Sequence, residues 1–410
     1  MRNLIVAIAA LLLPVAALAG GYAVPNVNAR DLAMSGSAQA AQDDAAATYA
    51  LPAALARLNG LSLSADVSLI DFRSTWTDPT SGATSTMIPK GAFPPALYAA
   101  YGLALSNGMR VGVGAGLTIP GGGYVFWEPN WPGRNEIISV DRKVYGTYLT
   151  AGVQLMPQLR LGGGVVYYRT TEHLIQGVNF LNSTPGQIEL GTAGGALSYD
   201  VSTEVQPILS LPLTIAFDYK HQGVQTLNGQ AHGTNIPAAL LPRLLDQNVS
   251  HVLTFPNQLN LAAALRPIAP LLLTFDWTWE RFHVYKQDVF LGDRGVSVVV
   301  PRDYKNGYTL RAGAEIKVLP VLKLRAGILR DTSPSRASTL SPTLPDSDST
   351  AVTFGVGIDP TPNLEISAAY FYDKEDSITT TGTEAFPGTY DTRANIFALS
   401  VTWKPGTSTK

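Results

Sequence analysis

Apolar and polar residues alternate along most of the chain from Leu61 onward. The alternation is clearest in five segments: Leu211–Lys220, Leu271–Phe282, Tyr308–Lys317, Leu364–Asp373 and Phe397–Trp403. A period of two residues predicts β-strands that have one apolar face and one polar face. The sequence therefore predicts an almost purely β protein.

Two environments could cover the apolar faces of these strands. A soluble sandwich would pack them against a second sheet, whereas a membrane barrel would turn them toward lipid. Large aromatic residues lie toward the strand ends on this face: Trp277, Trp279, Tyr370, Tyr372 and Trp403. Aromatic belts of this kind are typical of strands that end at a bilayer interface. The aromatic positions favour the barrel.

The lengths of the connections favour the barrel more strongly. We expect fourteen strands: 61–75, 92–106, 109–119, 142–156, 158–173, 186–205, 208–224, 250–267, 270–286, 304–318, 321–331, 348–359, 362–379 and 391–403. Tight turns are expected at Asn107-Gly108, Met156-Pro157, Gln206-Pro207, Pro267-Ile268-Ala269, Leu319-Pro320 and Pro360-Thr361-Pro362. Long connections are expected at 76–91, 120–141, 174–185, 225–249, 287–303, 332–347 and 380–390. Alternating short turns and long loops predict a 14-stranded antiparallel transmembrane β-barrel of the Gram-negative outer membrane.

The N-terminal residues predict export from the cytoplasm. Arg2 precedes an apolar run, Leu4–Leu18, which ends in the small-residue sequence Ala17-Leu18-Ala19. This arrangement is typical of a signal peptide, here residues 1–19. A transmembrane helix is the alternative, but the run is short for one and contains Pro14.

Composition excludes several classes of function. Charged residues make up 15% of the 410 residues and the net charge is −2, so nucleic acid is not an expected partner. The chain has no cysteine, which excludes disulfides, thiol catalysis and an N-terminal lipid anchor. The five histidines show no paired ligand spacing, and no metal or cofactor is expected. Asp346 and Asp348 fit no established calcium loop.

The polar face of the strands is expected to line the lumen. Its charged members are Asp218, Lys220, Asp276, Glu280, Arg311, Glu315, Lys317, Arg325, Glu365 and Asp373. Both signs of charge are present, so ion pairs across the interior are expected; the alternative is that these groups only hydrate and brace the wall.

Residues 20–60 precede the strands and are rich in small residues. The segment Arg30–Leu55 contains adjacent carboxylates and Pro52 among alanines, which suggests short helices. Since a fourteen-stranded barrel is wide enough to leak, we expect this segment to be a plug in the lumen. An unstructured periplasmic tail is the alternative. Residues 61–403 would form the barrel and 404–410 a periplasmic tail.

The plug segment resembles the hatch of the outer-membrane transporters for long-chain fatty acids and hydrocarbons, the FadL/TodX/OmpP1 type. The residues that match the family's pattern are Ala29, Arg30, Ala33, Met34, Gly36, Asp43, Asp44, Ala45, Tyr49, Pro52, Ala53 and Leu55. Further similar stretches follow in order: Trp131–Ile137, Phe255–Pro267, "LLLTFDWTWERF", "LRAGILRDTSP" and Leu344–Ser349. The family's Asn-Pro-Ala reads Leu51-Pro52-Ala53 here, and seven residues follow Trp403, where such barrels usually end on an aromatic residue.

The resemblance implies passive, TonB-independent uptake of hydrophobic molecules by a monomer that is surrounded by outer-membrane lipid and lipopolysaccharide. The ligand would be captured on exposed apolar loops by Tyr124, Phe126, Trp127, Trp131, Ile236, Leu240, Leu241, Leu244 and Leu245. Arg134 or Lys143 could bind a carboxylate headgroup. The plug or gate would include Tyr22, Arg30, Met34, Asp43, Asp44, Tyr49 and Pro52. The ligand would then pass to a pocket in the lumen near the plug and leave sideways through the barrel wall, at a gap near Gly112, Gly114 and Gly116.

Two other classes of protein remain open. A general diffusion porin would also be a barrel, but it should lack an N-terminal insert and carry polar outer loops. A lipid-acting barrel enzyme would need a Ser-His pair, and no GxSxG motif is present, so we expect no enzyme. The sequence does not distinguish fatty acids from alkanes or monoaromatic compounds.

Overall fold

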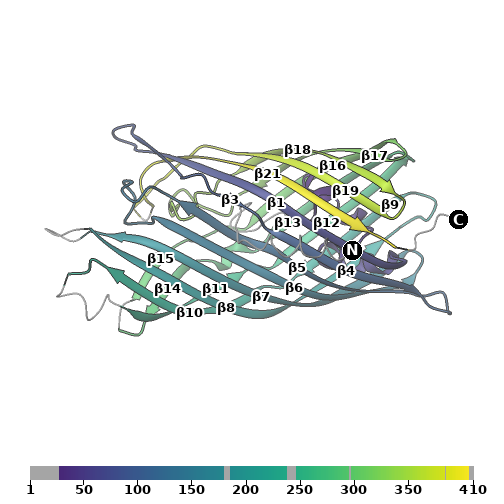
Figure 1. Ribbon diagram of the computed structural model, residues 1–410, viewed down its shortest axis with the longest axis horizontal. Coiled ribbons are helices and arrows are strands. Elements are labelled where there is room, and N and C mark those ends of the chain that lie inside the picture. Colours follow the sequence, from purple (N-terminus) through teal and green to yellow (C-terminus); the bar gives the residue numbers. More distant parts are fainter. Residues whose placement is uncertain (1–26, 180–184, 238–245, 295–296, 384, 406–410) are drawn as a thin grey trace, which may run out of the picture.

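The computed structural model describes residues 27–179, 185–237, 246–294, 297–383 and 385–405. Its strands close into one antiparallel β-barrel, with the purple N-terminal helices inside one end (Figure 1). The expected signal peptide, residues 1–19, lies outside the described residues, as do Tyr22, Leu240, Leu241, Leu244 and Leu245. No described helix is long and apolar enough to cross a membrane.

The strands vary from 2 to 20 residues in length. They are β1 (Gly60–Thr77), β2 (Thr84–Thr86), β3 (Gly91–Ala92), β4 (Pro95–Ala104), β5 (Arg110–Phe126), β6 (Ser139–Met156), β7 (Leu159–Val178), β8 (Gly186–Val205), β9 (Leu213–Lys220), β10 (Gly223–Thr234), β11 (Gln247–Phe255), β12 (Gln258–Ile268), β13 (Leu271–Glu280), β14 (Gln287–Gly292), β15 (Ser297–Pro301), β16 (Gly307–Leu319), β17 (Leu322–Thr332), β18 (Ser349–Thr361), β19 (Leu364–Glu375), β20 (Ile378–Thr379) and β21 (Thr389–Trp403).

These segments build the fourteen expected wall strands. Both β9 and β10 pair with β8, so they are one wall strand that is interrupted at His221 and Gln222. The pairs β3 with β4, β11 with β12, β13 with β14 and β15 with β16 likewise form single wall strands. Pairing of β1 with β21, from Leu63↔Trp403 to Thr77↔Thr389, closes the barrel. The predicted fold class and strand number are confirmed.

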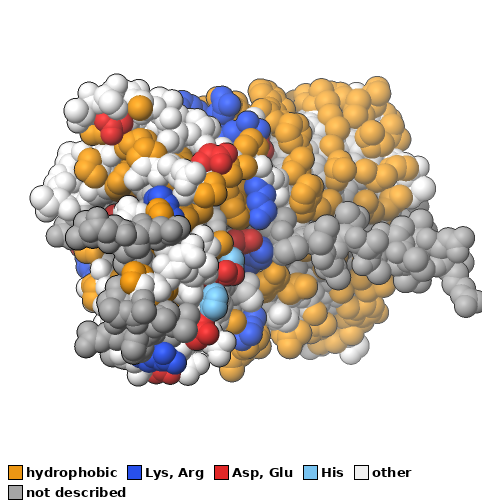
Figure 2. Space-filling view, turned by 60° about the vertical axis from the view of Figure 1, so that its left-hand side comes forward, with side chains coloured by type: hydrophobic (Ala, Val, Ile, Leu, Met, Phe, Trp, Pro, Cys, Tyr) orange, Lys and Arg blue, Asp and Glu red, His pale blue; other side chains and the backbone are white. Residues whose placement is uncertain are grey.

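The apolar face of the wall points outward, as predicted. On β13, Leu273 and Phe275 are exposed, whereas Thr274 and Asp276 between them are buried in the lumen. Figure 2 shows the outward side chains as a broad hydrophobic belt, with charged side chains gathered where the belt ends. Of the charged residues expected in the lumen, only Lys317 is exposed, at the end of β16. An exposed apolar belt of this kind is stable only against lipid.

Several expected loops contain strands. The connection expected at 225–249 is shorter, because β10 runs to Thr234 and β11 begins at Gln247. The hairpin of β14 and β15 occupies the connection expected at 287–303. The expected loop 120–141 begins later, because β5 runs on to Phe126.

The N-terminal segment 27–59, here called the plug, lies inside the barrel. It contains α2 (Ala29–Leu32), α3 (Ala47–Ala50) and two 3₁₀ turns, η1 (Gln39–Ala41) and η2 (Pro52–Arg57). A third such turn, η3 (Phe282–Val284), connects β13 to β14. The Asn28 side chain caps α2 by accepting a hydrogen bond from the Asp31 N–H at 2.8 Å. The plug fills the end of the barrel where the short turns lie (Figure 1).

Candidate functional site

A row of glycines on the barrel wall seats the second half of the plug. Its members lie directly opposite one another on four adjacent strands: Gly102, Gly112, Gly152 and Gly162. A Cβ atom at Gly112 would lie 2.2 Å from the Leu55 carbonyl oxygen, and one at Gly162 would lie 2.2 Å from the Ala53 nitrogen. Ser202 extends the row on β8, and its Oγ accepts the Ala53 N–H at 2.9 Å. Only glycine lets the plug backbone lie this close to the wall.

A second row seats the first half of the plug on the opposite side. It consists of Thr274, Gly313, Gly327 and Thr353, which lie opposite one another on β13, β16, β17 and β18. The Thr353 hydroxyl donates to the Ala33 carbonyl oxygen at 2.9 Å, and the Ser37 and Thr274 hydroxyls lie 2.6 Å apart. The plug is therefore fixed on two sides by backbone contacts.

Arg30 joins the plug to the wall through a buried ion pair. Its Nε lies 3.1 Å from Glu315 Oε2. The same oxygen also accepts a hydrogen bond from Arg325 Nε at 2.8 Å. Its Nη1 lies 2.8 Å from Asp43 Oδ1, and the same carboxylate also pairs with Lys404 Nζ at 3.3 Å. The guanidinium thus links two parts of the plug with β16 and, through Asp43, with the residue that follows β21.

The remaining plug residues named above have different surroundings. Met34, Asp44 and Pro52 are buried, and Tyr49 is half-buried. Leu51, which replaces the family's Asn, is also buried, among alanines of the plug and wall. The hydrogen bonds in this region come from other residues. Gln39 donates to the Ala50 carbonyl oxygen at 2.6 Å, and Thr150 donates to the Thr48 carbonyl oxygen at 3.2 Å.

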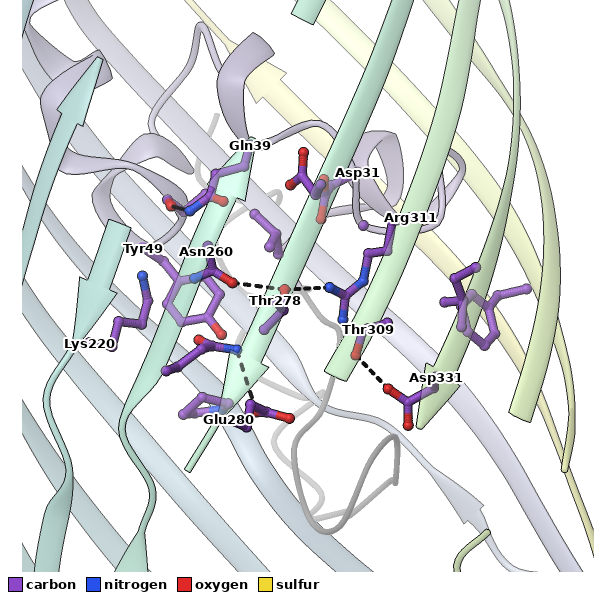
Figure 3. Close-up of a pocket in the computed structure, with 18 of the residues that line it drawn as sticks. Asp31, Gln39, Tyr49, Lys220, Asn260, Thr278, Glu280, Thr309, Arg311 and Asp331 are labelled. Atoms are coloured by element: carbon purple, nitrogen blue, oxygen red, sulfur yellow. Dashed lines mark hydrogen bonds between the residues drawn. The ribbon is translucent and has the colours of Figure 1, made fainter. Parts of the chain in front are cut away.

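A cavity that we call the inner cavity lies in the lumen against the plug. It encloses about 1030 Å³, including space open to solvent. Its polar lining comprises Asp31, Gln39, Lys220, Gln258, Asn260, Asp276, Thr278, Glu280, Thr309, Arg311, Asp331, Ser349 and Asp373. Figure 3 shows the wall residue Arg311 near the plug residue Asp31; Arg311 donates a hydrogen bond to Thr278 Oγ1 at 2.6 Å. Polar and charged side chains therefore make up most of the lining of the cavity next to the plug.

Asp31 is the plug carboxylate that faces this cavity. Burial raises the pKa of its carboxyl to about 6, although the Ala38 N–H donates to Oδ1 at 2.8 Å and the charges of Arg311 and Arg30 act in the opposite direction. The carboxyl therefore titrates within the range of pH that cells encounter.

The aromatic residues expected on the outer surface are instead buried. Tyr124, Trp127 and Trp131 are each at most 3% exposed, and Phe126 packs against them. Trp127 stacks on Trp131 with ring centroids 4.4 Å apart, and Trp131 also meets Trp76 and Phe386. The prediction of an exposed aromatic surface was wrong, because Trp76 and Phe386, distant in sequence, cover these rings.

A second cavity, the outer cavity, lies among the strand ends away from the plug. It encloses about 1370 Å³, including space open to solvent. Its apolar lining comprises Val140, Leu174, Ile188, Leu190, Ala231, Val249, Phe290, Val298, Val300 and Leu344. Ile236, expected to capture substrate, is half-buried and does not line it. This cavity has the apolar character of a binding pocket.

The charged groups of the outer cavity differ from those predicted. Arg142 and Arg302 line it, and they pair with Glu172 at 2.6 Å and with Asp288 at 2.9 Å. Arg134 instead donates to backbone oxygens and to Asn179, and Lys143 lies 3.0 Å from Asp141. Neither predicted headgroup residue lines the cavity. The register of β6 places Arg142 there, and only its proximity to Lys143 in the sequence could have suggested it.

The wall is interrupted on one side of β5. Among the described residues, β4 pairs with β5 only from Leu97↔Leu117 to Ala104↔Arg110, and contact resumes where the Ile88 N–H donates to Phe126 at 2.7 Å. On its other side, β5 shifts register against β6 between Thr118 and Gly121. Pro120, within this stretch, lines the inner cavity. We call residues 118–125 the wall gap.

The wall gap does not coincide with the three glycines predicted to form it. Gly112, Gly114 and Gly116 pair with both β4 and β6, so the ladder is continuous there. These positions are glycine for another reason, because a Cβ atom at Gly114 would lie 2.2 Å from Thr48 Oγ1 of the plug. The predicted position of the gap was wrong by a few residues.

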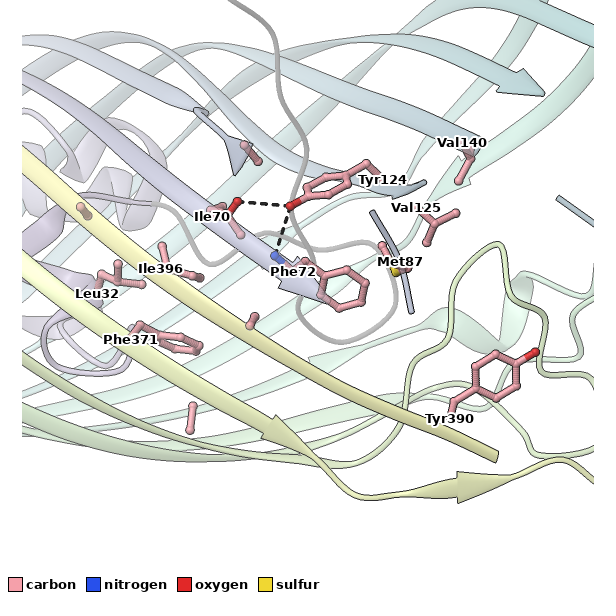
Figure 4. Close-up of a cluster of buried hydrophobic side chains, with 14 of the residues drawn as sticks. Leu32, Ile70, Phe72, Met87, Tyr124, Val125, Val140, Phe371, Tyr390 and Ile396 are labelled. Atoms are coloured by element: carbon pink, nitrogen blue, oxygen red, sulfur yellow. Dashed lines mark hydrogen bonds between the residues drawn. The ribbon is translucent and has the colours of Figure 1, made fainter. Parts of the chain in front are cut away.

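Side chains close the wall gap from within. The Tyr124 hydroxyl accepts a hydrogen bond from the Phe72 N–H at 3.1 Å and donates to the Ile70 carbonyl oxygen at 3.2 Å (Figure 4). Met87 and Ala92, which precede β4, belong to the same buried cluster. Tyr124 therefore provides a hydrogen-bond acceptor for the Phe72 N–H of β1, just beyond the residues that pair with β3.

The described part of the chain shows no cluster of side chains arranged to bind a metal ion. No group of three or more His, Asp or Glu side chains in that part is positioned to hold a metal ion. Asp346 and Asp348, whose spacing fits no calcium loop, both accept hydrogen bonds from Ser333, and Asp346 also from Ser335.

Comparisons with known proteins agree with this architecture. Residues 10–404 match the family described as "Outer membrane protein transport protein (OMPP1/FadL/TodX)". A solved FadL homologue of Pseudomonas aeruginosa is similar with a TM-score of 0.84 and 19% identity, over 94% of this chain and 99% of that one. The Ralstonia pickettii toluene transporter TbuX and the P. putida toluene transporter TodX are each similar with a TM-score of 0.68 and 15% identity, over 92% of this chain and 98% and 97% of theirs. A comparison with curated proteins found no match.

The fold therefore defines a plugged outer-membrane β-barrel of the transport type. The chain belongs to the OMPP1/FadL/TodX family of outer-membrane transport proteins. It is a Gram-negative outer-membrane protein, and its family is one of transporters rather than enzymes.

Proposed function

We propose that this chain is a passive channel through which hydrophobic small molecules cross the outer membrane, without energy from TonB. The ligand enters the outer cavity, moves to the inner cavity beside the plug, and leaves sideways through the wall gap into the bilayer. Lipid and lipopolysaccharide surround the barrel, which acts as a monomer. The observation that carries this proposal is an apolar outer cavity inside a barrel whose other end is filled by the plug.

The outer cavity supports entry of an apolar molecule. Ten apolar side chains line it, and its two arginines are neutralised by paired carboxylates. Transfer of apolar surface from water into such a site is favourable in proportion to the area buried. Trp127 and Trp131 pack in the cluster beside it and would form part of the entrance.

The plug and the wall gap support a sideways exit. The glycine row and the second row of small residues both hold the plug backbone against the wall. A path straight through the barrel would therefore require the plug to move as a unit. Pro120 brings the inner cavity to the one side of β5 where ladder bonds are missing. An apolar molecule that leaves there enters lipid directly and avoids the aqueous periplasm.

Uptake of a labelled neutral hydrocarbon tests the proposal. Toluene is a suitable probe, because two of the similar structures are toluene transporters. A host that lacks such channels should take up labelled toluene faster when it expresses this chain, and a protonophore should leave the initial rate unchanged. Uptake equal to that of the empty host, or abolished by the protonophore, would refute the proposal.

Narrowing the outer cavity provides a matched pair of variants. Ala231 lines this cavity and is buried, whereas Val252 is exposed on the outer face of β11. Ala231→Trp should reduce toluene uptake severalfold, and Val252→Trp should leave it unchanged, with equal amounts of both proteins in the membrane.

A further inference from the structure

The inner cavity is lined by more carboxyl groups than cationic groups. Five carboxylates line it: Asp31, Asp276, Glu280, Asp331 and Asp373. Only two cations line it, Lys220 and Arg311, and Lys220 is already held by Asp218 at 2.6 Å and by Asp200 at 3.2 Å. Arg311 is therefore the one cation of the described lining that is not ion-paired with carboxylates of the wall.

The register of five neighbouring strands brings these groups together. Asp276 lies opposite Arg311, Thr309 lies opposite Asp331, and Ala351 lies opposite Asp373. The carboxylates thus come from β13, β17 and β19, and Asp31 reaches the same space from the plug. Figure 3 shows Asp31, Glu280 and Asp331 around Arg311.

Two of these carboxylates present oxygens that have no hydrogen-bond partner. Asp276 Oδ1 and Asp373 Oδ1 are fully buried and unpaired, and their residues are 3% and 5% exposed. A buried carboxylate oxygen without a donor is costly, so it is a strong acceptor for any donor or cation that enters. Both residues line the inner cavity, so these covered oxygens lie directly beneath its surface.

The opposite side of the cavity is aromatic. Tyr49 and Tyr148 meet with ring centroids 5.1 Å apart, and Tyr168 and Phe255 meet at 5.0 Å. Lys220 Nζ lies 5.2 Å from the centre of the Tyr49 ring, so this wall already faces one cation. Aromatic faces combined with carboxylates are the surroundings that bind organic ammonium groups.

We propose that the inner cavity binds the positively charged head of a hydrophobic amine or quaternary ammonium compound. The ammonium lies among Asp276, Glu280 and Asp373, and the apolar body lies against Tyr148, Tyr168 and Phe255. This assignment rests on the proposed function and narrows its ligand class at this site. A carboxylate headgroup would meet five others here, so the cavity disfavours fatty acids.

Three ligands with one apolar body and different heads test the proposal. They are 4-phenylbutyl-trimethylammonium, 4-phenylbutanol and 5-phenylpentanoate, which dissolve in water and bind weakly to micelles. Calorimetry on the purified full chain in a non-ionic detergent, corrected for empty micelles, should show the ammonium binding about tenfold or more tightly than the carboxylate. Equal affinities, or tighter binding of the carboxylate, would overturn it.

Neutral variants locate the binding site. Asp276→Asn and Asp373→Asn together, and Glu280→Gln separately, should each reduce the advantage of the ammonium by about three- to tenfold. Asp391→Asn, at an exposed carboxylate outside the cavity, should preserve it. An undiminished advantage in the folded Asp276/Asp373 variant or in Glu280→Gln would overturn the site. Toluene uptake by the wild type separates the two proposals, because uptake without ammonium preference refutes this inference alone.

Discussion

The hydroxyl of Tyr124 on β5 accepts a hydrogen bond from the backbone N–H of Phe72 on β1, at 3.1 Å. The two residues are 52 positions apart, and the bond spans the side of β5 where strand pairing is missing. Here a hydrogen bond of the Tyr124 side chain takes the place of bonds between neighbouring strands. Breaking it would open this part of the wall and leave the strand pairing elsewhere intact. This makes Tyr124 the best candidate for a latch at the proposed exit.

Tyr124→Phe should loosen this part of the wall. The Phe72 N–H and the Ile70 carbonyl would lose their shared partner in a buried region, at a cost of about 1–3 kcal/mol. Hydrogen exchange at the Phe72 amide should become faster while exchange in β7 and β8 stays slow. Tyr101→Phe, at an exposed outward side chain, is the matched control. Unchanged protection of the Phe72 amide would exclude the latch.

Adding one methyl group to the glycine row should disturb the plug. In Gly112→Ala the new Cβ would lie 2.2 Å from the Leu55 oxygen, whereas in Gly191→Ala it would meet no atom within 4 Å. We expect Gly112→Ala to lose about 1–3 kcal/mol of stability, or to relieve the clash by displacing the plug and raising conductance. Gly191→Ala should resemble the wild type. If both variants behave alike, the plug does not rest on this row.

Removing the Arg30 guanidinium should strongly destabilise the plug. Arg30→Met leaves Glu315 buried with one of its two arginines, and breaking such a pair costs about 3 kcal/mol or more. Lys286→Met removes an exposed pair with Asp303 and should change little. Denaturant titration in detergent measures both, and similar midpoints for the two variants would contradict the proposed role of Arg30.

Asp31 should make the folded state more stable in mild acid. Because burial raises its pKa from 3.8 to about 6, the folded chain binds this proton more tightly than the unfolded chain does. Its contribution is fully present below about pH 4 and is lost as the pH rises through about 6, for a total of about 3 kcal/mol. The free energy of unfolding should fall more steeply over this range for the wild type than for Asp31→Asn. Parallel curves would rule out the shift.

The sequence predicted the wall well because its signal is local. Alternation in segments such as Leu271–Phe282 depends only on which face meets lipid, and β13 has that orientation. The plug was also predictable, since its small residues and the family pattern both lie within Arg30–Leu55. Each of these features can be read from adjacent residues.

The cavities were less predictable because they depend on distant contacts. Trp131 is apolar and lies in a long connection, which suggests exposure, but Trp76 and Phe386 bury it. The charge of the inner cavity arises from the register between β13, β16 and β17, which no single segment encodes. The sequence did place Asp276 and Glu280 in the lumen, though not beside Asp331.

Conductance in planar bilayers tests the central claim, a membrane barrel with a filled lumen, most directly. The wild type should conduct almost no ions, because the plug is fixed on both glycine rows. A chain that lacks Arg30–Leu55 should still assemble and open a large, steady pore, since a fourteen-stranded barrel is wide enough to conduct water and ions. A large conductance in the wild type, or an assembled deletion variant that stays closed, would contradict the account.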